Sequence, residues 1–100
     1  MSLDLSSALL RQIAHDHGTP VWVYDADMIR RRIADLSVFD TVRFAQKANS
    51  NTHVLRLMRE QGVKVDAVSL GEIERALRAG FQPGCTPGQP SEIVFTADLL

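Results

Sequence analysis

The sequence has a single cysteine, Cys85, so no disulfide can close within the chain and no zinc site can be built from cysteines alone. Lysine and arginine number 11 against 12 aspartates and glutamates, and this balance provides no basic surface for nucleic acid. No apolar run is long enough to span a membrane. The first residues lack the basic start and apolar core of a signal peptide. These absences predict a cytoplasmic protein with neither nucleic-acid nor membrane partners.

What remains is ordinary for one small globular domain: 100 residues, of which 45% are hydrophobic and 23% charged. One basic run, Arg30–Arg32, falls in a helical pattern, and we interpret it as a solvated helix face in preference to a phosphate-binding patch. His15 and His17 lie two residues apart on a predicted helix and so point in different directions. We therefore predict no metal site.

Capping residues and apolar periodicity predict four helices. The first begins after Ser6 or Ser7, and the second begins after Asp25. The third begins after Asn51 or Thr52, and the fourth begins after Ser69. Their predicted ends are, in the same order, Gly18, Phe39–Asp40, Gly62 and Gly80.

Four β-prone segments alternate with these helices, at residues 21–24, 41–47, 63–69 and 93–96. From Thr41 onward each connection between strands contains a helix, so these strands should be parallel with right-handed crossovers. Three parallel strands do not close a domain, whereas a barrel needs eight. We expect an α/β fold made of the opening βα units of a parallel (β/α)8 barrel, incomplete and part of a longer protein.

Lys47, Asp66 and Ser69 lie at or near the carboxyl ends of predicted strands, where parallel barrels carry their chemistry. Lys47 is either a solvated lysine or an amine that attacks an aldehyde, if a crowded site lowers its pKa. Asp66 is either an edge aspartate or a carboxylate that stabilises a protonated amine. Strand alternation leaves open which residues of this strand face the barrel interior. Glu72 lies three residues after Ser69, and a capping box is sufficient to explain it.

Motifs in a fixed order resemble the diaminopimelate decarboxylases. The segment Phe44-Ala45-Gln46-Lys47-Ala48-Asn49-Ser50-Asn51 is similar to their pyridoxal-phosphate lysine motif. The other matching segments are His17–Asp25, Val65–Glu72, Ala79–Phe81 and Ile93–Phe95. Any one of these motifs is weak, but together they favour this family over the alanine racemases, whose lysine motif differs.

The resemblance implies the alanine-racemase-like barrel of type III pyridoxal-phosphate decarboxylases, with a second β-domain. Residues 1–24 would link to that β-domain and residues 25–100 would form the first part of the barrel. Lys47 would hold pyridoxal 5'-phosphate covalently, with Asp66 and Glu72 beside it as cofactor-binding residues. The activity implied is conversion of meso-2,6-diaminopimelate to L-lysine and carbon dioxide, by a homodimer when full length. The phosphate loop and the substrate contacts would lie downstream, so residues 1–100 alone should be inactive.

Some features depart from the family pattern, because Leu70 stands where glycine is common and the glycine and lysine that often follow the last strand are missing. Three other interpretations remain, since the substrate contacts would lie outside these residues. One is a decarboxylase of ornithine, arginine or carboxynorspermidine, with the same cofactor. Another is a non-catalytic pyridoxal-phosphate-binding barrel protein, and the last is a structural or interaction segment without a cofactor.

Overall fold

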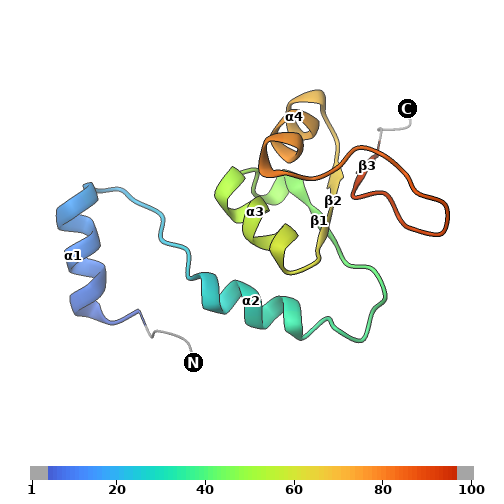
Figure 1. Cartoon of the computed structure of the whole chain (residues 1–100). Helices are drawn as coiled ribbons and strands as arrows, with labels where there is room; N and C mark the ends of the chain where they lie inside the picture. The colour runs from blue at the N-terminus through green and yellow to red at the C-terminus, as the bar shows by residue number, and fades with distance from the viewer. Residues whose placement is uncertain (1–4, 97–100) are drawn as a thin grey trace.

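A computed structural model describes residues 5–96 (Figure 1). None of the helices in this range has the length and apolarity needed to cross a membrane. In chain order, the elements are α1 (Ser7–His17), α2 (Ala26–Ala34), β1 (Arg43–Ala45), the short 3-10 helix η1 (Gln46–Ala48), α3 (Thr52–Glu60), β2 (Lys64–Ala67), α4 (Leu70–Ala79) and β3 (Ile93–Phe95).

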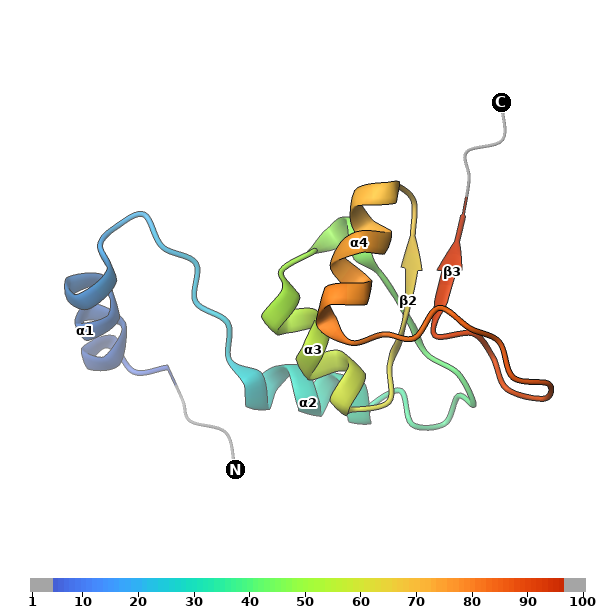
Figure 2. The ribbon, with the colours of Figure 1, turned by 45° about the horizontal axis from the view of Figure 1, so that its top comes forward.

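The three strands form one parallel sheet in the order β1-β2-β3. In this register Phe44 lies opposite Val65, and Val65 lies opposite Ile93. Helices α3 and α4 lie together on one side of the sheet (Figure 2). This arrangement confirms the predicted parallel α/β fold.

The core lies between the sheet and these two helices. Leu55 of α3 and Val65 of β2 are fully buried, and Phe81 is 1% exposed. Phe44 and Ile93 pack against this cluster, so their side of the sheet is the helix-covered side. Strand alternation then places the next set of partners, Ala45, Asp66 and Val94, on the side without helices. The sequence left open which face of the sheet carries Asp66, and the structure places it on the side without helices.

The predicted helix starts are confirmed, because each N-cap side chain accepts hydrogen bonds from the first turn. These caps are Ser6, Asp25, Asn51 and Ser69. The predicted stops also agree for three helices, since Gly18, Gly62 and Gly80 follow α1, α3 and α4 with positive φ values of 84°, 84° and 106°. The predicted end of α2 at Phe39–Asp40 is wrong, because this helix ends at Ala34. Local chemistry therefore fixes most element boundaries.

The amino-terminal part stands apart from the sheet (Figure 1). Helix α1 contains no buried residue, and the radius of gyration, 15.9 Å, exceeds the roughly 13 Å of a compact chain of this length. The predicted strand Val21–Tyr24 is wrong for the described chain, because this segment has no strand partner and Trp22 is 87% exposed. A β-prone sequence forms a strand only where another strand satisfies its backbone groups.

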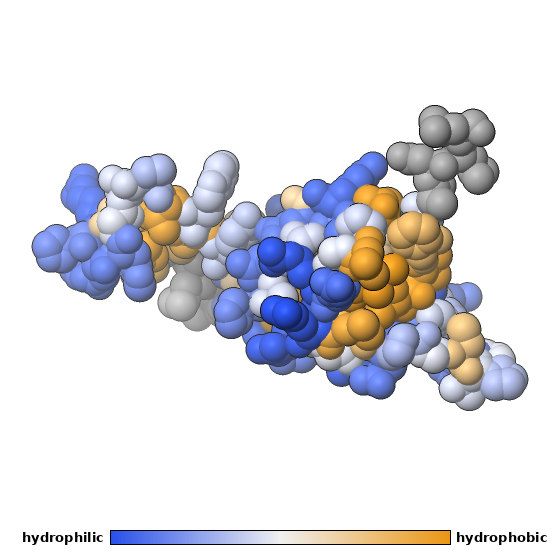
Figure 3. Space-filling view, turned by 90° about the horizontal axis from the view of Figure 1, so that it is seen from above, coloured by the Kyte–Doolittle hydropathy of each residue, from blue (hydrophilic) through white to orange (hydrophobic). Residues whose placement is uncertain are grey.

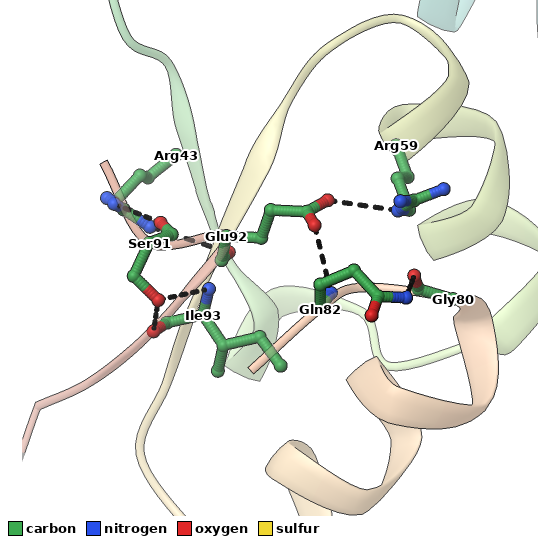
Figure 4. Close-up of polar contacts among 7 residues, drawn as sticks. All are labelled: Arg43, Arg59, Gly80, Gln82, Ser91, Glu92 and Ile93. Carbon is green, nitrogen blue, oxygen red and sulfur yellow. Dashed lines mark hydrogen bonds and ion pairs between the residues drawn. The ribbon is translucent and has the colours of Figure 1, made fainter. Parts of the chain in front are cut away.

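At the amino end of the sheet, two charged side chains tie the strands to the loop that precedes β3 (Figure 4). The Arg43 guanidinium donates to the carbonyl oxygens of Ser91 at 2.6 Å, Val65 at 3.2 Å and Glu92 at 3.5 Å. The Glu92 carboxylate pairs with Arg59 Nε at 3.0 Å and accepts a hydrogen bond from the backbone N–H of Gln82 at 3.0 Å. These contacts fix β3 without a covalent link.

We predict that Arg43→Met lowers the free energy of unfolding by about 1–3 kcal/mol, because it leaves partly buried carbonyl groups without their donor. Arg32→Met is the matched control. Arg32 is largely exposed, and within residues 5–96 its one ion pair is with Asp35 at 3.4 Å, so its loss should cost less than about 1 kcal/mol. Urea unfolding of the two variants measures the difference, and equal midpoints would contradict the bracing role of Arg43.

Candidate active site

Lys47 lies in η1, directly after β1 and at the carboxyl end of the sheet, and its side chain is exposed. The predicted strand 41–47 is therefore too long, because the observed strand ends at Ala45. A turn forms instead: the Asn49 amide and the Ser50 hydroxyl both donate to the Gln46 carbonyl oxygen, each at 3.0 Å. Strand alternation consequently does not apply to Lys47.

Gln46, next to Lys47, is a site residue that the sequence analysis missed. Its side chain is completely buried, and Nε2 donates to the backbone carbonyl oxygen of Glu72 at 2.7 Å. A signal was available, because in the predicted strand 41–47 Gln46 falls on the same face as Phe44, which packs against the core. Polarity obscured this signal, since glutamine is mostly exposed in folded proteins.

Asp66 lies on the side of the sheet without helices, on the strand next to β1, and is partly buried. The Thr96 hydroxyl, just after β3, donates to Asp66 Oδ1 at 2.6 Å, which fixes the carboxylate. Helix η1 packs against β2, so the turn carrying Lys47 and the strand carrying Asp66 are neighbours. Within residues 5–96, however, no ion pair joins Lys47 to Asp66 or Glu72.

Glu72 and Ser69 form the predicted capping interaction, with the Glu72 carboxylate reaching the amide one residue before the cap. The Glu72 amide donates to Ser69 Oγ at 3.2 Å, and Ser69 Oγ donates to Glu72 Oε2 at 3.4 Å. Glu72 Oε1 accepts the Val68 amide at 3.4 Å. Both carboxylate oxygens therefore contact the start of α4, while the Glu72 carbonyl contacts the turn that bears Lys47.

The substitution Glu72→Gln separates the capping role of this side chain from any role of its negative charge. Glutamine also completes a capping box, so Glu72→Gln should leave the free energy of unfolding within about 0.5 kcal/mol of the parent. If the carboxylate also supports a cofactor, the same variant should bind pyridoxal phosphate more weakly. Urea unfolding and cofactor titration measure the two effects. Unchanged cofactor affinity would show that Glu72 caps the helix and does not support the cofactor.

The arrangement fits an aldehyde cofactor. It offers one primary amine at the carboxyl end of the sheet, with the fixed Asp66 carboxylate on the adjacent strand. An amine reacts with an aldehyde, and a nearby carboxylate stabilises a protonated nitrogen. Across residues 5–96, no group of three or more His, Cys, Asp or Glu side chains is placed to hold a metal ion. Fold and site together describe an α/β domain that places one lysine amine where an aldehyde cofactor could be held.

Comparison with protein families identifies the class. Residues 26–99 match the family described as "Pyridoxal-dependent decarboxylase, pyridoxal binding domain". The chain belongs to this family, whose matched domain binds pyridoxal. The match begins one residue after the Asp25 cap and includes Lys47, Asp66 and Glu72.

Individual relatives carry a more specific name. The chain is 63% identical to the diaminopimelate decarboxylase of Escherichia coli strain K12 over 97 residues, which are 97% of this chain and 22% of that protein. It is 59% identical to the Streptomyces coelicolor enzyme of the same name over 96 residues, covering 96% of this chain and 21% of that protein. The chain thus spans about a fifth of the length of these relatives.

A solved structure agrees in fold. A crystal structure of diaminopimelate decarboxylase superposes with a TM-score of 0.87 at 63% identity, covering 97% of this chain and 22% of the other. The resemblance seen in the motifs is therefore confirmed, and so is the α/β fold class.

Proposed function

We propose that residues 1–100 are the amino-terminal part of a pyridoxal-phosphate-dependent diaminopimelate decarboxylase. The observation that carries this proposal is 63% identity to diaminopimelate decarboxylase across 97% of the chain. The reaction breaks the bond between one α-carbon of meso-2,6-diaminopimelate and its carboxylate, and a proton takes the carboxylate's place, so the products are L-lysine and carbon dioxide. We call the full-length protein that carries these residues the complete enzyme.

Each site residue has a proposed task. Lys47 binds the cofactor through its side-chain nitrogen Nζ, and its exposure at the sheet's carboxyl end leaves it accessible. Asp66, fixed by Thr96, supplies negative charge beside that nitrogen. Glu72 supports the same site from the first turn of α4. Pyridoxal phosphate, when bound, supplies a ring that accepts the electrons left by departing carbon dioxide.

The proposal includes a larger architecture. Residues 25–100 would continue into an eight-stranded barrel, and residues 1–24 would link to a β-domain. Exposed apolar surface supports a continuation beyond β3: Val94 is 36% and Phe95 54% exposed. A hydrophobic area is visible on the larger part of the molecule (Figure 3). A single isolated chain rarely leaves such a surface in water.

We also propose that the complete enzyme is a cytoplasmic homodimer. The dimer rests on the family resemblance. The cytoplasmic location is supported by the lone Cys85, which is exposed and unpaired, as is usual in a reducing compartment.

The experiment that tests the function is a substrate comparison. Purified complete enzyme with pyridoxal phosphate is given meso-diaminopimelate, ornithine, arginine or carboxynorspermidine, and released carbon dioxide is measured. We expect kcat/KM to be highest for meso-diaminopimelate. A higher kcat/KM for another substrate would show that the protein is a decarboxylase of that substrate instead. Cofactor attachment without carbon dioxide from any substrate would indicate a non-catalytic barrel protein.

A further inference from the structure

Gln46 combines complete burial with a position next to the proposed cofactor lysine. Among the polar and charged side chains of residues 5–96, it alone is classed as buried, with no exposed surface. Its Nε2 donates to the Glu72 carbonyl oxygen at 2.7 Å, a short bond for two neutral groups. This bond connects η1 to the first turn of α4, 26 residues later in the chain.

The turn that holds Lys47 is fixed at both ends. Gln46 fixes its start through Glu72, and the Gln46 carbonyl oxygen closes it by accepting the Asn49 amide and the Ser50 hydroxyl, each at 3.0 Å. Lys47 lies between these two points. Its side chain is exposed, so the backbone of this turn, which Gln46 holds, decides where the lysine side chain begins.

Stability alone does not explain a glutamine here. The side-chain oxygen Oε1 is buried and has no hydrogen-bond partner in the part of the chain that the structure describes. A buried acceptor without a donor is destabilising, and it offsets what the bond from Nε2 contributes. Methionine has a similar volume and would fill the same space without that penalty. The polar side chain therefore points to a role other than core packing.

We propose that Gln46 is a positioning residue for Lys47: its buried amide ties η1 to α4 and sets where the amine stands at the sheet's carboxyl end. The inference rests on the proposed function, because it concerns the nitrogen through which the cofactor would be held. Gln46 itself touches neither cofactor nor substrate in this role.

The test compares two matched glutamine substitutions in the complete enzyme stripped of cofactor. Gln46→Met removes the bond to Glu72, and Gln82→Met removes a similar bond, from Nε2 to the Gly80 carbonyl oxygen at 3.1 Å, at the other end of α4. Pyridoxal phosphate is added at rising concentrations, the link is reduced with borohydride, and labelled Lys47 is quantified by mass spectrometry. We expect Gln46→Met to raise the half-labelling concentration by about tenfold, the most that one neutral hydrogen bond provides.

The melting temperature of Gln46→Met should stay within about 2 °C of the parent, because the unpartnered oxygen disappears with the bond. Gln82→Met should label like the parent. Equal labelling of Lys47 in Gln46→Met and the parent would overturn the positioning role and leave the proposed function intact. Absence of label on Lys47 in the parent itself would instead refute the proposed function.

Gln46→Glu provides a second test if the methionine variant does not fold. A carboxyl group can donate to the Glu72 carbonyl only when it is protonated. The ratio of Lys47 labelling in this variant to labelling in the parent should therefore rise as the pH falls. Because a buried carboxylate also destabilises the fold when it ionises, circular dichroism is recorded at each pH. A labelling ratio that only follows the folded fraction of the variant, or that does not change with pH, would overturn the inference.

Discussion

Replacing Lys47 with alanine in the complete enzyme is expected to lower kcat for carbon dioxide release from meso-diaminopimelate by about 10³-fold or more. The reason is that the amine is the proposed point of cofactor attachment, and alanine has no nucleophilic nitrogen. Because the Lys47 side chain is exposed and forms no ion pair within the described chain, folding should be unaffected. Steady-state assays measure the loss, and circular dichroism verifies the fold.

The chain offers a matched control, because it contains only one other lysine, Lys64. Lys64 begins β2, at the opposite end of the sheet from η1. Arginine keeps the positive charge at either position but stays protonated and does not attack an aldehyde. Lys47→Arg should therefore be as inactive as Lys47→Ala, while Lys64→Arg retains activity. Parent-like rates in both Lys47 variants would refute the proposed mechanism.

Replacing Phe81 with alanine is expected to lower the free energy of unfolding by about 3–5 kcal/mol, the largest stability effect predicted for this chain. Phe81 is 1% exposed and packs with Leu55, Val65 and Ala76 between the sheet and its helices. The truncation leaves a cavity that these neighbours fill only in part. Urea unfolding of the complete enzyme measures the change.

Two further variants sharpen this test. Phe81→Leu keeps more of the buried volume and should lose less stability than Phe81→Ala. Phe39 is 62% exposed, so Phe39→Ala should change the free energy of unfolding by less than about 0.5 kcal/mol. Similar losses for Phe81→Ala and Phe39→Ala would contradict the core described here.

Features set by neighbouring residues could be predicted from the sequence. Asp25 and Ser69 cap helices because a short oxygen-bearing side chain meets the free amides of the first turn, and this depends on three or four residues. Gly80 ends α4 because its φ of 106° suits glycine. The alternation of strands and helices likewise fixed the parallel sheet.

Features set by distant residues could not be predicted in the same way. The segment Val21–Tyr24 has β-prone residues but no partner strand in the described chain, so it does not form one. The strand before Lys47 ends early because Gln46 is held by Glu72, a contact between residues 26 positions apart. The side chain of Asp66 could be assigned to a face only once the helices were seen to cover the other.

The most direct test is to map the residue of the complete enzyme that carries the cofactor. Pyridoxal phosphate is bound, the link is reduced with borohydride, and the labelled peptide is sequenced by mass spectrometry. We predict one label, on Lys47 in the turn after β1. A label on Lys64, or on any lysine outside these 100 residues, with Lys47 unmodified, would contradict the assignment.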